Sequence, residues 1–201
     1  MNFIYLISFS IILTFINLTA YAYNAKDVEY FLLNSKCHKC DLSNYSFEEK
    51  YLDQAIISES NLIGTNFNKV KMANSRISLS NFTNATFIHA DMNTTLIEDS
   101  NFTNANLSEI NLVSSTIINS IFVKANFDLA KMYGISAKFT IFDEANITNV
   151  NIQKSILSSS SFVKTNFTGS LLSLSLMDNV NLSHANMSKV KARGVNFTDS
   201  N

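Results

Sequence analysis

Two cysteines separated by two residues are the clearest chemical signal in the sequence. Cys37 and Cys40 are the only cysteines of the chain, and His38 and Lys39 stand between them. Such a pair forms a structural disulfide in an oxidising compartment, a thioredoxin-like redox couple in a βαβ setting, or half of a zinc site. The chain has no βαβ pattern, and His38 alone does not complete the ligands of zinc. We therefore favour a structural disulfide, with the redox couple and a pair of free thiols as alternatives.

The other residues capable of chemistry do not gather in the sequence. His89 and His184 are far apart, and acidic pairs such as Glu98-Asp99 occupy positions that the repeat described below turns towards solvent. No phosphate-binding loop or nucleophile motif occurs. The sequence therefore predicts no catalytic residue, no cofactor and no metal site, and we do not expect an enzyme.

The composition is that of one compact domain without strong charge. Of the 201 residues, 46% are hydrophobic and 15% are charged, and the formal net charge is -1. This balance excludes a largely disordered chain and gives no general attraction to phosphates, so nucleic-acid binding is not expected. Because the chain has no proline and four glycines, its turns must be built differently from ordinary Pro-Gly turns.

An export signal is expected at the N-terminus. Residues 3–18 are mostly apolar, and Ala20-Tyr21-Ala22 provides the small-x-small pattern of a cleavage site. We interpret residues 1–22 as a cleaved signal peptide, although no Lys or Arg precedes the apolar run. An uncleaved membrane anchor is the alternative. The mature protein is then expected in the periplasm of a bacterium or secreted, without a membrane span.

The body of the chain repeats every five residues. From Leu42 to Phe197, each fifth residue is large and apolar except Ala137 and Ala192. A second, smaller series stands two residues earlier, as in Ala85 and Ser100. A period of five fits neither a helix nor a flat strand. Two inward residues around one outward residue describe a very short extended segment, and the remaining two residues turn a corner. At Ala137, where volume is lost, we expect a local bulge.

A weaker period of twenty sets the number of sides. One column of the large series consists of phenylalanines twenty residues apart: Phe82, Phe102, Phe122, Phe142 and Phe162. Like residues stack when four units of five complete one circuit, so residues 40–201 predict an all-β, four-sided solenoid of about eight coils. Gly64, Asn84 and similar residues fall two places after a core residue. There a type II turn requires positive φ, which Gly and Asn tolerate.

Units such as Ala105-Asn106-Leu107-Ser108-Glu109 and Ala185-Asn186-Met187-Ser188-Lys189 resemble the A(D/N)LXX consensus of pentapeptide-repeat proteins. The resemblance covers residues 40–201 and implies a right-handed quadrilateral β-helix, usually without catalysis. Residues 23–39 precede the repeats, and within them 24–34 suit a short amphipathic helix that caps the first coil. The following Cys-His-Lys-Cys-Asp-Leu-Ser stretch is similar to the entry of exported members of this family.

The function expected from these features is that of a non-catalytic, exported scaffold or protein-interaction module whose partner the sequence does not name. A candidate interaction stripe of outward apolar residues comprises Ile56, Leu79, Leu96, Ile118, Ile156 and Leu176, with Phe139 on the same side. A homodimer through the C-terminal coils is a further expectation. The alternative is a protein that binds DNA gyrase by imitating duplex DNA, as some family members do, which calls for a strongly acidic rod.

Overall fold

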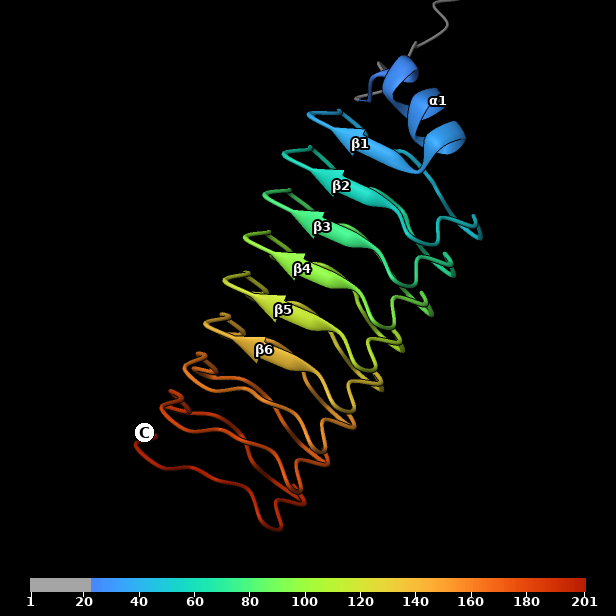
Figure 1. The fold of residues 1–201 in the computed structure, drawn as a ribbon. Helices are drawn as coiled ribbons and strands as arrows, with labels where there is room; N and C mark the ends of the chain where they lie inside the picture. Colours follow the sequence, from blue (N-terminus) through green and yellow to red (C-terminus); the bar gives the residue numbers. More distant parts are fainter. Residues whose placement is uncertain (1–22) are drawn as a thin grey trace, which may run out of the picture.

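The computed structural model describes residues 23–201 as one elongated coil with a helix at its N-terminal end (Figure 1). Its elements are α1 (Ala25–Asn34), β1 (Lys36–His38), β2 (Ile56–Ser58), β3 (Arg76–Ser78), β4 (Leu96–Glu98), β5 (Thr116–Ile118) and β6 (Ser136–Lys138). The predicted signal peptide, residues 1–22, lies outside the described residues. No helix within residues 23–201 has the length and apolar character needed to span a membrane.

The period of twenty is confirmed by the pairing of the strands. The six strands form one parallel sheet in the order β1 to β6, and each residue pairs with the residue twenty places on, as in Ile57 with Ile77. Five circuits lie between β1 and β6, and three further bridges of the same wall, Ser136–Ile156, Ile156–Leu176 and Leu176–Asn196, bring the total to eight. The other three walls are held by single parallel bridges with the same spacing.

The core consists of stacked columns of large side chains. Phe102 lies between Phe82 and Phe122, with ring centroids 4.6 and 4.8 Å apart and planes within 3° and 11° of parallel. Stacked rings also join Phe122 to Phe142 and Phe142 to Phe162. An adjacent column, in which Phe47, Phe67 and Phe87 stack in the same way, was not singled out in the sequence. Apolar burial along these columns is the main driving force of the fold.

The local bulge expected at Ala137 is absent, so that prediction was wrong. Ala137 pairs in register with Ile117, and its N–H donates to the carbonyl of Ile156 at 2.7 Å. Ile135 and Ala137 are both buried. Hydrogen bonds to the coils on either side fix the backbone at this position. A smaller core side chain therefore changes the packing of the core but not the path of the backbone.

The corners confirm the predicted backbone conformation and extend it. The residue two places after each core residue has positive φ throughout residues 39–199. These residues include Gly64 and Asn84, as expected, but also Leu79 and Phe139, with φ of 50° and 55°. The stacking explains this uniformity, since the corner N–H groups, apart from that of Phe139 and those of the last coil, donate to a carbonyl of the next coil, as Leu79 does to Glu98 at 3.1 Å.

One column of small inward residues is a hydrogen-bonded ladder. The backbone N–H of Ser60 donates to Ser80 Oγ at 3.1 Å, and that of Ser80 donates to Ser100 Oγ at 3.2 Å. Each hydroxyl in turn donates to the carbonyl two residues earlier, as Ser80 does to Ser78 at 2.7 Å. Within the described residues, no buried side-chain nitrogen or oxygen lacks a hydrogen-bond partner. We call the wall formed by β1 to β6 the strand wall. The serines therefore provide hydrogen-bond partners for backbone groups at the corner where the chain leaves the strand wall for the next wall.

Helix α1 caps the first coil, and a disulfide lies at the start of that coil. Val28 and Phe31 of α1 are buried, and the Phe31 ring meets that of Phe47 edge-on at 5.3 Å. Cys37 is bonded to Cys40. Cys37 pairs in register with Ile57, so it occupies the first core position of the strand wall. Cys40 stands at the head of the serine ladder, where its N–H donates to Ser60 Oγ at 3.1 Å.

Removing this disulfide should destabilise the capped end. Closing a four-residue loop contributes about 2 kcal/mol through the entropy of the unfolded chain, so the Cys37→Ala/Cys40→Ala variant should unfold with a free energy lower by that amount. Denaturant unfolding with and without reductant measures it. The wild type should lose stability in reductant and the double variant should not. Equal stability of the two proteins without reductant would contradict the assignment.

Candidate interaction surface along one corner

One corner of the solenoid presents two large apolar side chains where the backbone favours Asn or Gly. The corner between the strand wall and the next wall carries, on successive coils, Leu79, Asp99, Asn119 and Phe139, which we call the corner row. Leu79 and Phe139 are 58% and 59% exposed. Left-handed backbone is costly for such residues, and exposure gives them no compensating burial. Neither folding nor solubility accounts for them.

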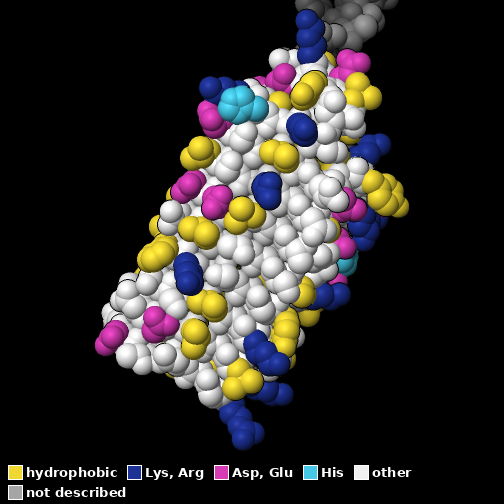
Figure 2. Space-filling model, in the orientation of Figure 1, with side chains coloured by type: hydrophobic (Ala, Val, Ile, Leu, Met, Phe, Trp, Pro, Cys, Tyr) yellow, Lys and Arg dark blue, Asp and Glu magenta, His cyan; other side chains and the backbone are white. Residues whose placement is uncertain are grey.

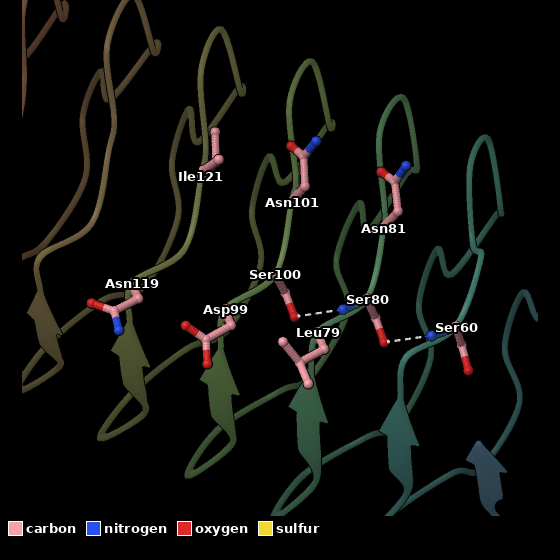
Figure 3. Close-up of a pocket in the computed structure, with 9 residues that line it drawn as sticks. All are labelled: Ser60, Leu79, Ser80, Asn81, Asp99, Ser100, Asn101, Asn119 and Ile121. Carbon is pink, nitrogen blue, oxygen red and sulfur yellow. Dashed lines mark hydrogen bonds between the residues drawn. The ribbon is translucent and has the colours of Figure 1, made fainter. Parts of the chain in front are cut away.

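A shallow groove of about 290 Å³ runs beside the corner row (Figure 3). We call it the corner groove; its lining residues are Ser60, Leu79, Ser80, Asn81, Asp99, Ser100, Asn101, Asn119 and Ile121. Figure 3 shows Leu79, Asp99 and Asn119 along one side, Asn81, Asn101 and Ile121 along the other, and the serine ladder between them. The groove is polar in the middle and apolar towards Leu79 and Ile121.

Asn81 and Asn101, two of the three asparagines that line the groove, have unused amide donors. Asn81 Oδ1 accepts from the N–H and the hydroxyl of Thr83, at 3.1 and 2.6 Å, and Asn101 Oδ1 accepts in the same way from Thr103. These bonds brace the turn, as an Asx turn does. Neither Nδ2 group has a hydrogen-bond partner among the residues that the structure describes. Each is therefore available to a bound molecule.

The wall that carries Asn106 behaves differently. There Asn126 Nδ2 donates to Asn106 Oδ1 at 3.2 Å, and Asn146 Nδ2 donates to Asn126 Oδ1 at 2.9 Å. In the middle of that wall, Asn126 and Asn146 each donate to the asparagine of the preceding coil. In the groove the threonine hydroxyls occupy the acceptor that a neighbouring amide would use. Within the described residues, Asn106 and Asn166 on that wall also have unused Nδ2 groups, so the groove differs from it by combining such donors with the carboxylate of Asp99 and the apolar side chain of Leu79.

Asp99 is the charged residue of the groove, and within residues 23–201 its carboxylate makes no hydrogen bond or ion pair. Other corner residues pair with the opposite charge on the next coil, such as Lys39 with Glu59 at 3.4 Å and Lys124 with Glu144 at 3.7 Å. The carboxylate of Asp99, which lies between the amide donors and the apolar ends of the groove, can form an ion pair with a cationic group of a bound molecule.

The closest of the corner ion pairs joins Glu49 to Lys69. Lys69 Nζ donates to Glu49 Oε1 at 2.8 Å. This hydrogen bond, together with the attraction between the two charges, lowers the pKa of Glu49 and raises the pKa of Lys69. Because both side chains are exposed, the pair organises the surface more than it stabilises the fold.

The six residues of the candidate stripe lie on the strand wall and the adjoining corner, but not in one continuous line. Arg76 pairs with Ile56 on one side and Leu96 on the other, and so separates them. Figure 2 shows hydrophobic side chains on this face interspersed with charged and other polar ones. Ile156 and Leu176 are direct neighbours. Packing does not constrain the residues at outward positions, so the stripe is not continuous. Of its six residues, only Leu79 lines the corner groove.

Ile118 and the histidines also lie outside the groove lining. Ile118 pairs with Glu98 and Lys138 on the coils to either side. His89 pairs with Glu109 at 3.3 Å on a different corner. Within the described part of the chain, no three His, Cys, Asp or Glu side chains come together as metal ligands would. The histidines therefore do not form a shared centre with the cysteines.

The sequence drew attention to Leu79 and Phe139 but not to the polar members of the groove. Asn81 and Asn101 belong to the repeat consensus and carry no distinguishing signal of their own. A threonine two residues after each of them, which takes up the amide oxygen, is the signal that could have found them. Asp99 could have been found as an acidic corner residue whose neighbours twenty residues away, Leu79 and Asn119, carry no positive charge.

The geometry defines a four-sided β-solenoid built from five-residue units. The family model for pentapeptide repeats matches residues 35–74, 60–99, 97–134 and 160–199, with eight copies. The chain belongs to the pentapeptide-repeat family. A comparison with curated protein sequences gives no match.

Two solved structures illustrate the shared fold. HetL, a pentapeptide-repeat protein involved in heterocyst differentiation regulation in the cyanobacterium Nostoc sp. strain PCC 7120, is 14% identical, with a TM-score of 0.62 over 88% of this chain and 94% of HetL. QnrB1, a plasmid-mediated fluoroquinolone resistance protein, is 13% identical in a trypsin-treated form. Its TM-score is 0.51 over 79% of this chain and 87% of QnrB1. At these identities the similarity concerns the fold alone.

Proposed function

We propose that the protein is a non-catalytic scaffold that binds a protein partner along the corner groove and the corner row. The observation that carries this proposal is that Leu79 and Phe139, both exposed at left-handed corner positions, lie in one corner row, and that Leu79 also lines the corner groove. Residues that break a local folding rule without a structural gain are expected at functional sites. A rod with satisfied buried groups holds such side chains in fixed positions, and this rigidity lowers the entropic cost of binding.

Photo-crosslinking tests this function. A photoreactive amino acid at Asn119 of the full chain, expressed in the producing cell, should give a covalent product with a defined protein. The product should disappear in the Leu79→Ser/Phe139→Ser variant. It should persist in Leu129→Ser/Leu174→Ser, because Leu129 and Leu174 are comparably exposed corner leucines, at 50% and 59%, on other corners. Absence of a product, or equal loss in both variants, would remove the proposal.

A stability measurement provides an independent check. Asn tolerates left-handed backbone better than Phe, so Phe139→Asn should raise the free energy of unfolding by about 1 kcal/mol while weakening partner capture. Denaturant unfolding of the purified variant measures the first effect. If Phe139→Asn instead destabilises the protein, Phe139 has a structural role and the argument from its position fails.

The proposal includes export to the periplasm or the exterior of a bacterial cell. The disulfide between Cys37 and Cys40 supports this location, since disulfides persist in oxidising compartments. N-terminal sequencing of the protein recovered from each cell fraction tests it. A mature chain that begins at Tyr23 and lies outside the cytoplasm is expected, and a full-length cytoplasmic chain would contradict it.

A homodimer through the C-terminal coils also belongs to the proposal. In the last described coil the core positions are less buried than elsewhere, and Phe197 is 37% exposed. Leu182 and Met187 are also only partly buried. Stacking two such ends would cover these side chains and pair backbone edges. Sedimentation should show a dimer at micromolar concentration, and a strict monomer would exclude it.

The charge distribution favours a scaffold over a DNA-mimicking protein that binds gyrase. The net charge is -1, and several charged corners are neutralised by partners on the next coil. A mimic of duplex DNA requires a dense negative surface instead. A gyrase supercoiling assay separates the two functions, since a scaffold of this kind should leave supercoiling unchanged.

A further inference from the structure

We infer that the partner segment in the corner groove is an extended peptide with a basic side chain between two large apolar side chains. This inference rests on the proposed function and specifies its ligand. It draws on three features of the described residues: unused amide donors on Asn81 and Asn101, the unpaired carboxylate of Asp99, and apolar side chains at Leu79 and Phe139.

The amides suit a peptide backbone. A main chain offers carbonyl acceptors and N–H donors in alternation. Asn81 and Asn101 each present an unused NH₂ group on successive coils, and Asn119, whose side chain makes no hydrogen bond within residues 23–201, presents both a donor and an acceptor. An extended segment lying along the groove can therefore exchange hydrogen bonds with more than one coil.

The spacing of the corner row matches an extended chain. Leu79 and Phe139 are separated by three coils, which corresponds to about 14 Å at about 4.8 Å per coil. Four residue steps of an extended chain at about 3.4 Å also cover about 14 Å. Residues 1, 3 and 5 of such a segment point to the same side. Positions 1 and 5 then contact Leu79 and Phe139, and position 3 falls between Asp99 and Asn119.

Charge selects the side chain at position 3. The Asp99 carboxylate has no cation of its own, and Glu98 precedes it on β4 without an ion pair in the described chain. Lys138 lies beside Phe139, at the far end of the row. A Lys or Arg at position 3 would donate a charge-assisted hydrogen bond to Asp99, whereas an acidic residue there would be repelled. The segment therefore has the pattern apolar-x-basic-x-apolar.

Fluorescence anisotropy with defined peptides tests this assignment on the full chain. The probe is the labelled peptide Gly-Leu-Ser-Lys-Ser-Leu-Gly, and the comparison peptide carries Glu in place of Lys. The Lys peptide should bind about tenfold more tightly, which is the effect of one charge-assisted hydrogen bond. Asp99→Asn keeps a residue that tolerates the corner and should remove this preference. Leu79→Ser should weaken binding of the Lys peptide.

Matched controls are available on the opposite corner. Glu109→Gln removes a carboxylate that pairs with His89, and Leu129→Ser removes an exposed corner leucine; neither should change peptide binding. No binding, equal binding of the two peptides, or equal losses in the controls would overturn the inference. If crosslinking at Asn119 still depends on Leu79 and Phe139 while the peptides are not discriminated, the scaffold function stands and only the ligand assignment falls.

Discussion

Replacing Phe102 by alanine should lower the free energy of unfolding by about 3–5 kcal/mol, the usual effect of removing a buried aromatic ring. Phe102 is fully buried and stacks on Phe82 and Phe122. Its ring also lies 5.8 Å from that of Phe87 in the adjacent column. Because the coils above and below are held in place by their own hydrogen bonds, the cavity cannot collapse and most of the lost contact energy is not recovered. Denaturant unfolding followed by circular dichroism measures the change.

The matched control is the same substitution at the surface. Phe139 is 59% exposed, so Phe139→Ala should alter stability by no more than about 0.5 kcal/mol. In a solenoid each coil contacts only its neighbours, so amide hydrogen exchange in Phe102→Ala should quicken most near the substituted coil. A loss of protection spread evenly from β1 to Asn201 would show that the rod unfolds as one unit. Similar stabilities of the two variants would contradict the stacked core.

The core could be predicted from the sequence because burial acts directly on residue type. Every inward position of the rod requires an apolar or small side chain. The period of five and the column from Phe82 to Phe162 could therefore be recognised in the sequence. The structure places that column as expected. Positive φ at Gly64 and Asn84 was equally predictable, since few residues tolerate it.

The polar contacts of the site could not be predicted in the same way. Ser100 was recognised as small, but its hydroxyl accepts the N–H of Ser80 on the preceding coil, and this depends on the relative rotation of two coils. The unused amides of Asn81 and Asn101 depend on whether Thr83 and Thr103 turn their hydroxyls inward. Period and composition specify which residues share a wall, whereas they do not specify which donor meets which acceptor.

Leu79 and Phe139 are residue types that do not suit the backbone conformation of the corners they occupy. The fold imposes left-handed backbone at every corner whatever the residue, so the sequence is not needed to create these turns. A large apolar residue there is costly in the folded state and brings no burial. Such a conflict between local preference and structure, which Leu129 and Leu174 show singly on other corners, is expected at sites selected for something other than folding. Their position in one row with Asp99 links this selection to the groove.

The serine ladder should prove as important to the fold as an aromatic column. In the Ser80→Ala/Ser100→Ala variant, the backbone N–H groups of Ser60 and Ser80 lose their acceptors. An unsatisfied buried N–H costs about 1–3 kcal/mol, so the variant should lose about 2–6 kcal/mol of unfolding free energy. The carbonyls of Ser78 and Glu98 also lose donors. Thermal and denaturant unfolding of the purified chain measure the loss.

Ser78→Ala/Ser108→Ala is the matched control for this experiment. It removes two hydroxyls that make no hydrogen bond within the described chain, so it should leave stability within about 0.5 kcal/mol of the wild type. If the ladder variant is as stable as this control, water or a shifted turn supplies the missing acceptors. The floor of the corner groove could then rearrange. The match between the spacing from Leu79 to Phe139 and that of an extended peptide assumes a rigid row, so this match would no longer hold.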